Sequence, residues 1–175
     1  MLYRTAIVRR WSQGIEVRPP LLGKQIKTKN LQVIRAGDFL ISDIQASYGA
    51  MCMVGDPHDG LYVSNVYTIL VPRDEHRVLT PYFDQLSRTS LMRHLVVQSS
   101  NGFKAERIRL SFVLDTFMQQ KVYLPDDLAE QRRIAALLQL CDDEVILLDR
   151  KLALLKKQKQ GLMQQLLTGK VCVKT

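Results

Sequence analysis

The stretch LPDDLAEQRRIAALLQLCDDEVILLDRKLALLKKQKQGLMQQLLTGK, residues 124–170, has the pattern of a single very long helix. Asp127, followed three residues later by Glu130, is a carboxylate variant of the capping box that begins helices, and Pro125 lies just outside it. Gly169 supplies the usual stop. The roughly 40 residues between these signals would form a rod about 60 Å long, which exceeds the diameter of a small domain.

Apolar residues recur along this helix with the seven-residue repeat of a coiled coil. Two sets, the second offset from the first by four residues, form a seam that holds for more than four heptads. Such a narrow stripe favours packing against another helix. Lys159 is the one charged residue in the stripe, and it either reaches solvent near the end of the rod or fixes the register of the pair. The predicted dimer interface consists of Ile134, Leu138, Cys141, Val145, Leu148, Leu152, Leu155, Leu162 and Leu166.

Upstream of the helix, the sequence predicts a mixed α/β domain. Residues 1–30 are basic and turn-rich, which predicts loop with a short strand. Apolar runs between residues 31 and 72 predict at least four successive strands. Thr80 and Pro81 predict an N-cap and the first position of a helix over about 81–97, followed by a loop at 98–103 and a strand near 119–125. The fold class is α+β, with a mixed α/β domain over residues 1–124 and a long coiled-coil helix over residues 125–175.

The charge of the chain is concentrated in the predicted domain. Among 175 residues, 25 are Lys or Arg and 17 are Asp or Glu, a formal net charge of +8. Residues 1–125 hold sixteen basic and ten acidic side chains, and residues 126–175 hold nine and seven. This excess favours an acidic partner, nucleic acid first and an anionic membrane second, with a generic basic protein as the alternative.

Basic and amide side chains gather in two segments of the domain, residues 24–30 and 98–109. Lysines and arginines in loops neutralise phosphates, and amides or arginines reach base edges in the major groove. For each single residue, solvated surface charge is the alternative. The predicted DNA-binding residues are Lys24, Gln25, Lys27, Lys29, Asn101, Lys104, Arg107 and Arg109.

No pattern in the sequence indicates a catalytic, metal or cofactor site. The three histidines have no paired spacing for a metal, and Cys52, Cys141 and Cys172 share no CxxC spacing. There is no glycine-rich phosphate loop, no Gly-x-Ser-x-Gly, and no Asn/Asp-Pro-Pro-Tyr/Phe motif with which amino-methyltransferases hold their target base. We therefore predict no cofactor, no metal and no enzymatic activity, against the alternative of a free-standing enzyme with a hidden site.

The sequence also predicts a cytoplasmic protein without a membrane partner. The start, MLYRTAIVRRW, reaches arginines before a signal-type apolar core can form, and no run approaches the roughly 18 apolar residues of a membrane span. Three cysteines without a disulfide framework fit a reducing compartment.

Two stretches of the chain resemble the DNA specificity subunits of type I restriction-modification systems. LPDDLAEQRRIAALL (residues 124–138) and LKKQKQGLMQQLLTGKV (155–171) are similar to that family's conserved region, which runs from Leu-Pro through a Glu-Gln-Arg/Lys-Arg-Ile box to Gln-Gln-Leu-Leu/Phe-Thr-Gly-Lys. IKTKNLQVIRAGDFLISDIQASYGAMCMVGDPHDGLYVSNVYTIL (26–70) resembles a target recognition domain through its Gly-Asp-Phe segment, Gly-Ala turn and Val-Ser-Asn strand. The match spans about residues 24–171.

The resemblance implies a division of labour between this chain and its partners. In the family, a recognition domain reads a few base pairs of double-stranded DNA, the conserved helix pairs antiparallel with a counterpart, and separate subunits methylate or cleave. The long helix would then set the gap between two half-sites and provide a platform for the methyltransferase subunit, with a restriction subunit as a further partner. The resemblance implies a structural or a methyltransferase-docking role for Glu130, Gln131, Arg132, Arg133, Gln164 and Gln165.

Two departures from the family leave alternatives open. A full subunit holds two recognition domains and two conserved helices, whereas this sequence has one of each, so pairing comes from a second copy or from a different half. Residues 1–23 lack the usual Trp-then-Leu-Gly opening, which leaves open a truncated half. The resemblance thus implies a non-catalytic specificity subunit that reads a half-site and dimerises, with an interaction-only half-subunit as the alternative.

Overall fold

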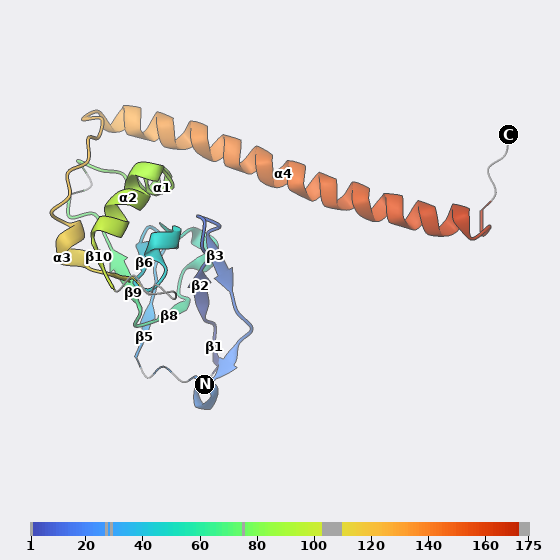
Figure 1. Cartoon of the computed structure of the whole chain (residues 1–175), viewed down its shortest axis with the longest axis horizontal. Coiled ribbons are helices and arrows are strands. Elements are labelled where there is room, and N and C mark those ends of the chain that lie inside the picture. The colour runs from blue at the N-terminus through green and yellow to red at the C-terminus, as the bar shows by residue number, and fades with distance from the viewer. Residues whose placement is uncertain (1, 27, 29, 75, 103–109, 172–175) are drawn as a thin grey trace. The chain divides into compact units, whose positions relative to one another are not determined.

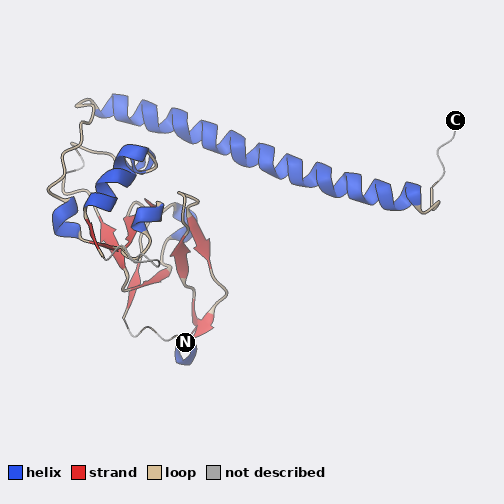
Figure 2. Ribbon diagram, in the orientation of Figure 1, coloured by secondary structure: helices blue, strands red, loops and turns tan. Residues whose placement is uncertain are grey.

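The computed structural model of the chain describes residues 2–26, 28, 30–74, 76–102 and 110–171. The chain forms two compact units, Met1–Ala135 and Ala136–Thr175, which we call the first and the second unit. The first unit combines short strands with helices, and the second contains most of one long helix (Figures 1 and 2). This mixture of strands and helices, with a long C-terminal helix, confirms the predicted α+β class.

Residues 1–30 contain more sheet than the sequence indicates. The elements are β1 (Leu2–Tyr3), β2 (Ala6–Val8), β3 (Ile15–Val17), β4 (Leu21–Leu22) and the 3-10 turn η1 (Gly23–Gln25). β1 pairs antiparallel with β4, and β2 pairs antiparallel with β3. The prediction of one short strand was wrong because each alternating run is only two or three residues long and lies among arginines and prolines. Ala6 and Val8 are nevertheless buried, as the inward side of β2.

Residues 31–70 form the strands that the sequence predicts. They are β5 (Leu31–Val33), β6 (Phe39–Ser42), β7 (Met51–Met53), β8 (Tyr62–Ser64) and β9 (Tyr67–Leu70), with 3-10 turns η2 (Ala46–Tyr48) and η3 (Asp56–His58). β6 is the centre of an antiparallel sheet in the order β7-β6-β9, and β5 pairs antiparallel with β8. The prediction of at least four successive strands is confirmed.

The central strand β6 separates two apolar clusters. Its side chains alternate between the faces of the sheet, so that Leu40 packs into one cluster with Ile34, while Phe39 and Ile41 pack into the other. All four residues of β6 are buried, which is why its sequence is apolar without the alternation of a half-exposed strand. Each fully buried aliphatic side chain contributes about 1.5–3 kcal/mol through the apolar surface that it removes from water.

The single helix predicted over residues 81–97 is instead two helices, α1 (Thr80–Ser87) and α2 (Ser90–Gln98). Thr89 causes the break: its hydroxyl donates to Leu86 O at 2.7 Å and accepts from Met92 N at 3.3 Å, so it caps α2. The predicted N-cap at Thr80 was wrong by one residue, because Leu79 occupies that position and Pro81 lies within the first turn. The two helices cover one side of the first unit's strands (Figure 2).

The region after α2 also differs from the prediction. Within the predicted loop at 98–103, β10 (Ser100–Asn101) pairs antiparallel with β11 (Ser111–Phe112), and the short helix α3 (Leu114–Phe117) follows. The strand predicted near 119–125 is absent, because these residues have neither strand nor helical structure. They form an extended connection that leads to the long helix.

The long helix α4 (Leu128–Leu167) begins and ends at the predicted signals. Asp127 Oδ1 accepts a hydrogen bond from Ala129 N at 2.8 Å, which confirms Asp127 as the cap. At the other end Gly169 takes a left-handed φ of 69°, and Val171 N donates back to Gln165 O at 3.2 Å. α4 is 40 residues long, so the predicted length is confirmed as well.

Candidate functional site

The predicted DNA-binding residues that the structure describes lie on separate strand pairs. Lys24 and Gln25 form the exposed η1 turn, and Gln25 Oε1 accepts a hydrogen bond from Leu22 N at 2.9 Å. Asn101 is exposed on β10. η1 follows β4 of the β1-β4 pair, whereas β10 belongs to the β10-β11 pair. The remaining predicted residues, Lys27, Lys29, Lys104, Arg107 and Arg109, lie outside the described part of the chain.

A third group of basic side chains, which the sequence reasoning missed, surrounds the turn between β2 and β3. Trp11 is 61% exposed at this turn and packs edge to face with Tyr48, with ring centroids 6.1 Å apart. The Arg10 guanidinium lies 4.8 Å from the Tyr48 ring centre, and that of Arg93 lies 5.9 Å from the Trp11 ring centre. The only sequence signal was the Arg-Arg-Trp string itself, because Tyr48 and Arg93 come from distant segments.

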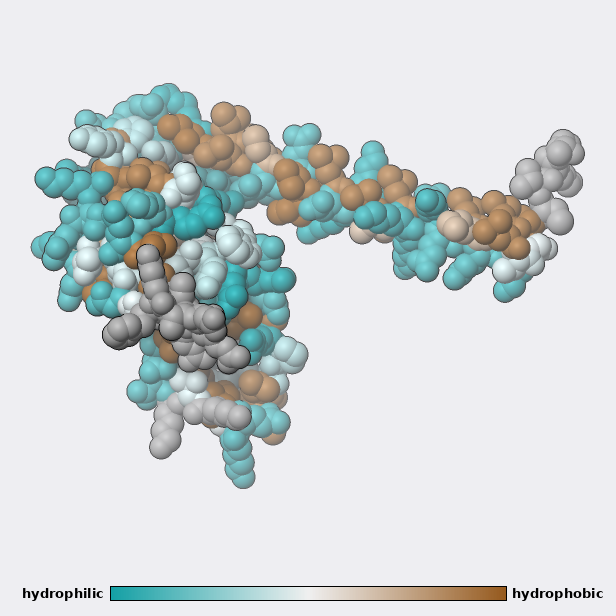
Figure 3. Space-filling model, viewed as in Figure 1, coloured by the Kyte–Doolittle hydropathy of each residue, from teal (hydrophilic) through white to brown (hydrophobic). Residues whose placement is uncertain are grey.

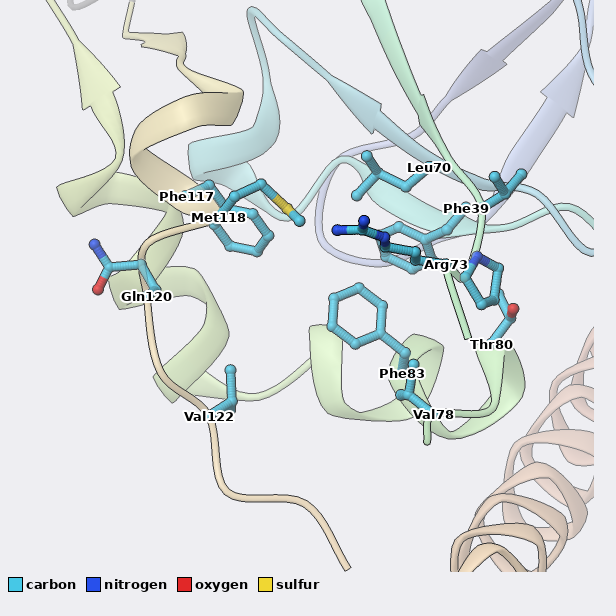
Figure 4. Close-up of a pocket in the computed structure, with 12 residues that line it drawn as sticks. Phe39, Leu70, Arg73, Val78, Thr80, Phe83, Phe117, Met118, Gln120 and Val122 are labelled. Carbon is cyan, nitrogen blue, oxygen red and sulfur yellow. The ribbon is translucent and has the colours of Figure 1, made fainter. Parts of the chain in front are cut away.

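An apolar cavity of about 270 Å³ opens at the edge of the apolar cluster that contains Phe39 and Ile41 (Figure 4). Phe39 and Phe83 form part of its wall with ring centroids 4.9 Å apart, and the Arg73 side chain extends across it (Figure 4). The rest of the lining includes Leu70, Phe117, Met118 and Val122. Among the residues that the structure describes, no histidine, cysteine or carboxylate lines this cavity.

Neither a metal cluster nor a reactive thiol occurs in the first unit's described residues. In the described ranges, no group of three His, Cys, Asp or Glu side chains could hold a metal ion. Burial raises the pKa of the Cys52 thiol to about 12, with a smaller contribution from the nearby Asp84 carboxylate. The thiol therefore stays protonated at neutral pH, and the thiolate that reacts or binds metals does not form.

The first turns of α4 are held within the first unit by one buried glutamine. Gln131 is fully buried; its Nε2 donates to Pro125 O at 2.8 Å and to Arg77 O at 2.9 Å. Its Oε1 accepts from Leu79 N at 2.9 Å. All three partners are backbone groups, so the side chain ties two loops to the helix.

This burial favours the structural alternative over docking for Gln131. Gln131 has no surface to offer a partner subunit, and it is a positioning residue of the fold instead. The other predicted docking residues are exposed: Glu130, Arg132, Arg133, Gln164 and Gln165. The four residues 130–133 are adjacent in the sequence and were therefore predicted to share one role. On the helix they point in different directions, and only Gln131 points into the first unit. Whether the exposed ones bind a partner stays a prediction.

Along the second unit, the predicted seam of α4 is exposed (Figure 3). Leu148 is 56% exposed and Leu155 is 52% exposed in the single chain. The other seam residues of this unit are exposed as well: Leu138, Cys141, Val145, Leu152, Leu162 and Leu166. Ile134, which belongs to the first unit, is half-buried. The helix therefore presents an apolar face that a second helix could cover.

A second apolar stripe, which the sequence reasoning missed, runs beside the seam. Leu140, Leu147 and Leu154 are 61–68% exposed and stand at seven-residue steps. Each precedes a seam residue by one position, so this stripe lies about 100° around the helix from Cys141, Leu148 and Leu155. The seam and the stripe together form a face wider than the stripe of a two-helix coiled coil. More than one neighbouring helix could pack on it.

Charged residues interrupt every apolar stretch of this helix. Across the described ranges, no helix is sufficiently long and apolar to cross a membrane.

Solved structures share this arrangement of a mixed domain and a long helix. The HsdS subunit from Thermoanaerobacter tengcongensis matches with a TM-score of 0.64 and 20% identity, over 94% of this chain and 41% of that chain. A chain from a study of complex assembly and conformational transition of the type I R-M system matches with a TM-score of 0.60 and 21% identity, over 86% of this chain and 37% of that chain. Neither a family model nor a curated protein matches the sequence. The chain spans about two fifths of the length of these solved structures, and over that length its fold is the fold of the HsdS subunit.

Proposed function

We propose that the chain is a non-catalytic DNA sequence-specificity subunit of a type I restriction-modification system. In this proposal, residues 1–124 read a half-site in duplex DNA, and α4 pairs with a second helix to direct a methyltransferase subunit. An endonuclease subunit is a further partner. The observation that carries the proposal is the apolar face of α4, which stays exposed from Leu138 to Leu166 in a chain with the HsdS fold.

The partner of the seam in this proposal is a second copy of the chain. Exposed apolar surface of this extent is unfavourable in water and marks an interaction site. The seam is built almost wholly of aliphatic residues, so the same face from a second copy complements it. Two copies related by two-fold symmetry would carry two identical recognition domains, and they would read an interrupted palindrome.

The methyltransferase subunit, in this proposal, uses the neighbouring stripe. Leu140, Leu147 and Leu154 remain exposed when a helix covers the seam, because they lie about 100° away from it. Exposed Arg132 and Arg133 at the start of α4 and Gln164 and Gln165 near its end would flank this contact. The stripe supplies apolar contact and the polar residues supply specificity, as in other interfaces.

Duplex DNA is the acidic partner that the charge of the domain favours. The predicted domain carries most of the formal excess of +8. The described lining of the cavity in the first unit is almost wholly apolar and contains no acid–base pair, which supports binding over catalysis by this chain. The chemical steps would then belong to the partner subunits.

Single-molecule sequencing of methylated bases in cellular DNA tests this function. The chain is co-expressed with a type I modification subunit, and each gene is also expressed alone. A new interrupted palindrome that requires both genes is the expected result. An asymmetric motif would replace the homodimer with a pair of different half-subunits. Soluble protein without any new motif would contradict DNA reading and leave the interaction-only half-subunit.

A further inference from the structure

The turn between β2 and β3 has an unusual backbone for its residues. Trp11 and Ser12 have φ angles of 61° and 54°, and they are the only non-glycine residues with positive φ in the described part of the chain. Residues with a Cβ adopt this left-handed region at a cost, and hairpin turns that require it usually carry glycine or asparagine. Such strain persists where the surroundings enforce it, and it gathers at functional sites.

Backbone hydrogen bonds to another segment hold this turn in place. Trp11 N donates to Tyr48 O at 2.7 Å, and Ser12 N donates to Gly49 O at 3.1 Å. Gly49 itself has a φ of 71°, and a Cβ built there would lie 3.5 Å from Ser12 Oγ. The turn therefore rests closely on the end of η2.

Two arginines of this cluster keep their charge available. Arg9 pairs with Glu16 at 3.4 Å, and Arg88 pairs with Asp84 at 2.7 Å. Arg10 and Arg93, by contrast, make no ion pair with any described carboxylate and lie against the rings of Tyr48 and Trp11. Stacking on an aromatic face orders a guanidinium without neutralising it.

A shallow cavity of about 190 Å³ lies between the turn and the start of α2. Trp11, Ser12, Tyr48 and Gly49 line one side, and Ser87, Arg88 and Arg93 line the other. Hydroxyl, guanidinium and aromatic groups thus surround one concave surface. Guanidinium and hydroxyl groups bind phosphate oxygens, and an aromatic ring between them packs on the sugar of a nucleotide.

We propose that the Trp11 turn, residues 9–12 together with Tyr48 and Arg93, contacts the sugar–phosphate backbone of duplex DNA. Arg10 and Arg93 bind phosphate oxygens, and Trp11 packs against the sugar between them. This inference rests on the proposed DNA-reading function and assigns that function a surface outside residues 24–30 and 98–109. The contact positions the domain on DNA and carries no base information by itself.

The double variant Arg10→Ala/Arg93→Ala tests the phosphate contacts in the full chain. Binding to a short random-sequence duplex is measured across a salt series, and Arg73→Ala/Arg77→Ala is the control because it removes two exposed charges elsewhere. Two lost phosphate contacts should weaken binding by about tenfold or more and reduce the slope of log affinity against log salt by about two. The control pair should leave that slope unchanged. Equal slopes in the two double variants would overturn the proposal.

Trp11→Gly separates binding from folding. Glycine accepts the left-handed backbone, so this variant should melt at the same temperature as the parent chain or higher, while its duplex affinity falls. A variant with lower stability and unchanged affinity would assign Trp11 a structural role and overturn its contact with DNA.

The possible failures are distinguishable. If the parent chain shows no salt-dependent duplex binding and directs no methylation, the proposed function falls together with this surface. If the parent chain binds DNA and the turn variants bind equally well, only the surface is wrong. Turn variants that keep duplex binding but no longer co-purify with the modification subunit would make the turn a protein contact, which also overturns the DNA assignment.

Discussion

At the scale of single residues, Gln131 shows how one side chain can hold together the start of the long helix. Its amide group satisfies three backbone groups, those of Leu79, Arg77 and Pro125. Burying such groups without partners costs about 1–3 kcal/mol each. One buried amide therefore has a larger effect on the first unit than any ion pair on its surface.

We expect Gln131→Leu to lower the free energy of unfolding of the first unit by about 2–4 kcal/mol, because three backbone groups lose their partner at once. Urea denaturation followed by the fluorescence of Trp11, the one tryptophan of the chain, measures this change. Gln139→Leu is the matched control, since Gln139 is exposed and bonds only to Asp143 within the helix. Equal denaturation midpoints for the two variants would contradict the role of Gln131.

Because Cys52 is buried, we expect the free energy of unfolding to fall at alkaline pH. Burial raises the pKa of its thiol from 9.0 to about 12 in the folded state. Between these values the unfolded chain loses the proton and the folded chain keeps it, so the free energy of unfolding falls as pH rises. The slope from this one group is about 1.4 kcal/mol per pH unit within that window and zero below it. Urea denaturation of Cys52→Ala and of the parent chain from pH 8 to 11 measures the contribution of this thiol to the pH dependence. Parallel curves would refute it.

At the scale of elements, α4 and the strands of residues 31–70 were predictable from sequence, whereas β1 to β4 and the break between α1 and α2 were not. Asp127 and Gly169 are local chemical signals, and the heptad repeat accumulates over 40 residues. The break at Thr89 depends on one hydroxyl, and the strands β1 to β4 are too short for their alternation to stand out. The Trp11 turn was missed because its partners Tyr48 and Arg93 are close to it only in the fold.

The seam gives the first prediction at this scale. Leu148→Asp with Leu155→Asp should abolish dimer formation and methylation targeting together, because pairing would bury two charges in an apolar contact. Both residues are more than half exposed, so the single chain should keep its fold and helix content. Ala153→Asp with Gln160→Asp places the same charges outside the seam and should leave the dimer intact. Light scattering measures the mass, and a dimer in the first variant would refute the seam.

Charges in the apolar stripe beside the seam should affect docking of the methyltransferase subunit and not the dimer. Leu147→Asp with Leu154→Asp should leave the dimer intact while the methyltransferase subunit no longer co-purifies, because these residues lie beside the seam. Light scattering of the variant alone and affinity purification with the subunit measure the two effects separately. Loss of the dimer would show that pairing uses both stripes, and an intact complex would exclude the stripe as a docking surface.

At the scale of the whole molecule, the proposed function would make the number of heptads in α4 the quantity that sets the spacing of the two DNA half-sites. In the proposed dimer, antiparallel pairing of the two copies of α4 would place the two recognition domains at opposite ends of the paired helices. A helix rises about 1.5 Å per residue, and successive base pairs of DNA are about 3.4 Å apart. Seven residues therefore correspond to about three base pairs.

Deleting residues 148–154 removes one heptad and keeps the seam in register. We expect the methylated motif to keep its two half-sites while its central gap shortens by about three base pairs. Methylation sequencing with the modification subunit reads the gap directly. Deleting residues 148–149 instead turns the rest of the seam by about 200° around the helix and should abolish methylation. An unchanged gap after the seven-residue deletion would show that α4 does not set the spacing.

The uncovered leucines of α4 also bear on how much of the protein a cell retains. A chain that has not yet paired exposes them along most of the helix. Proteases and chaperones of the cell act on exposed apolar segments, so unpaired chains should be removed faster than assembled ones. The supply of this protein would then follow the supply of its partners without a dedicated regulator, and surplus chains would not persist to occupy DNA alone.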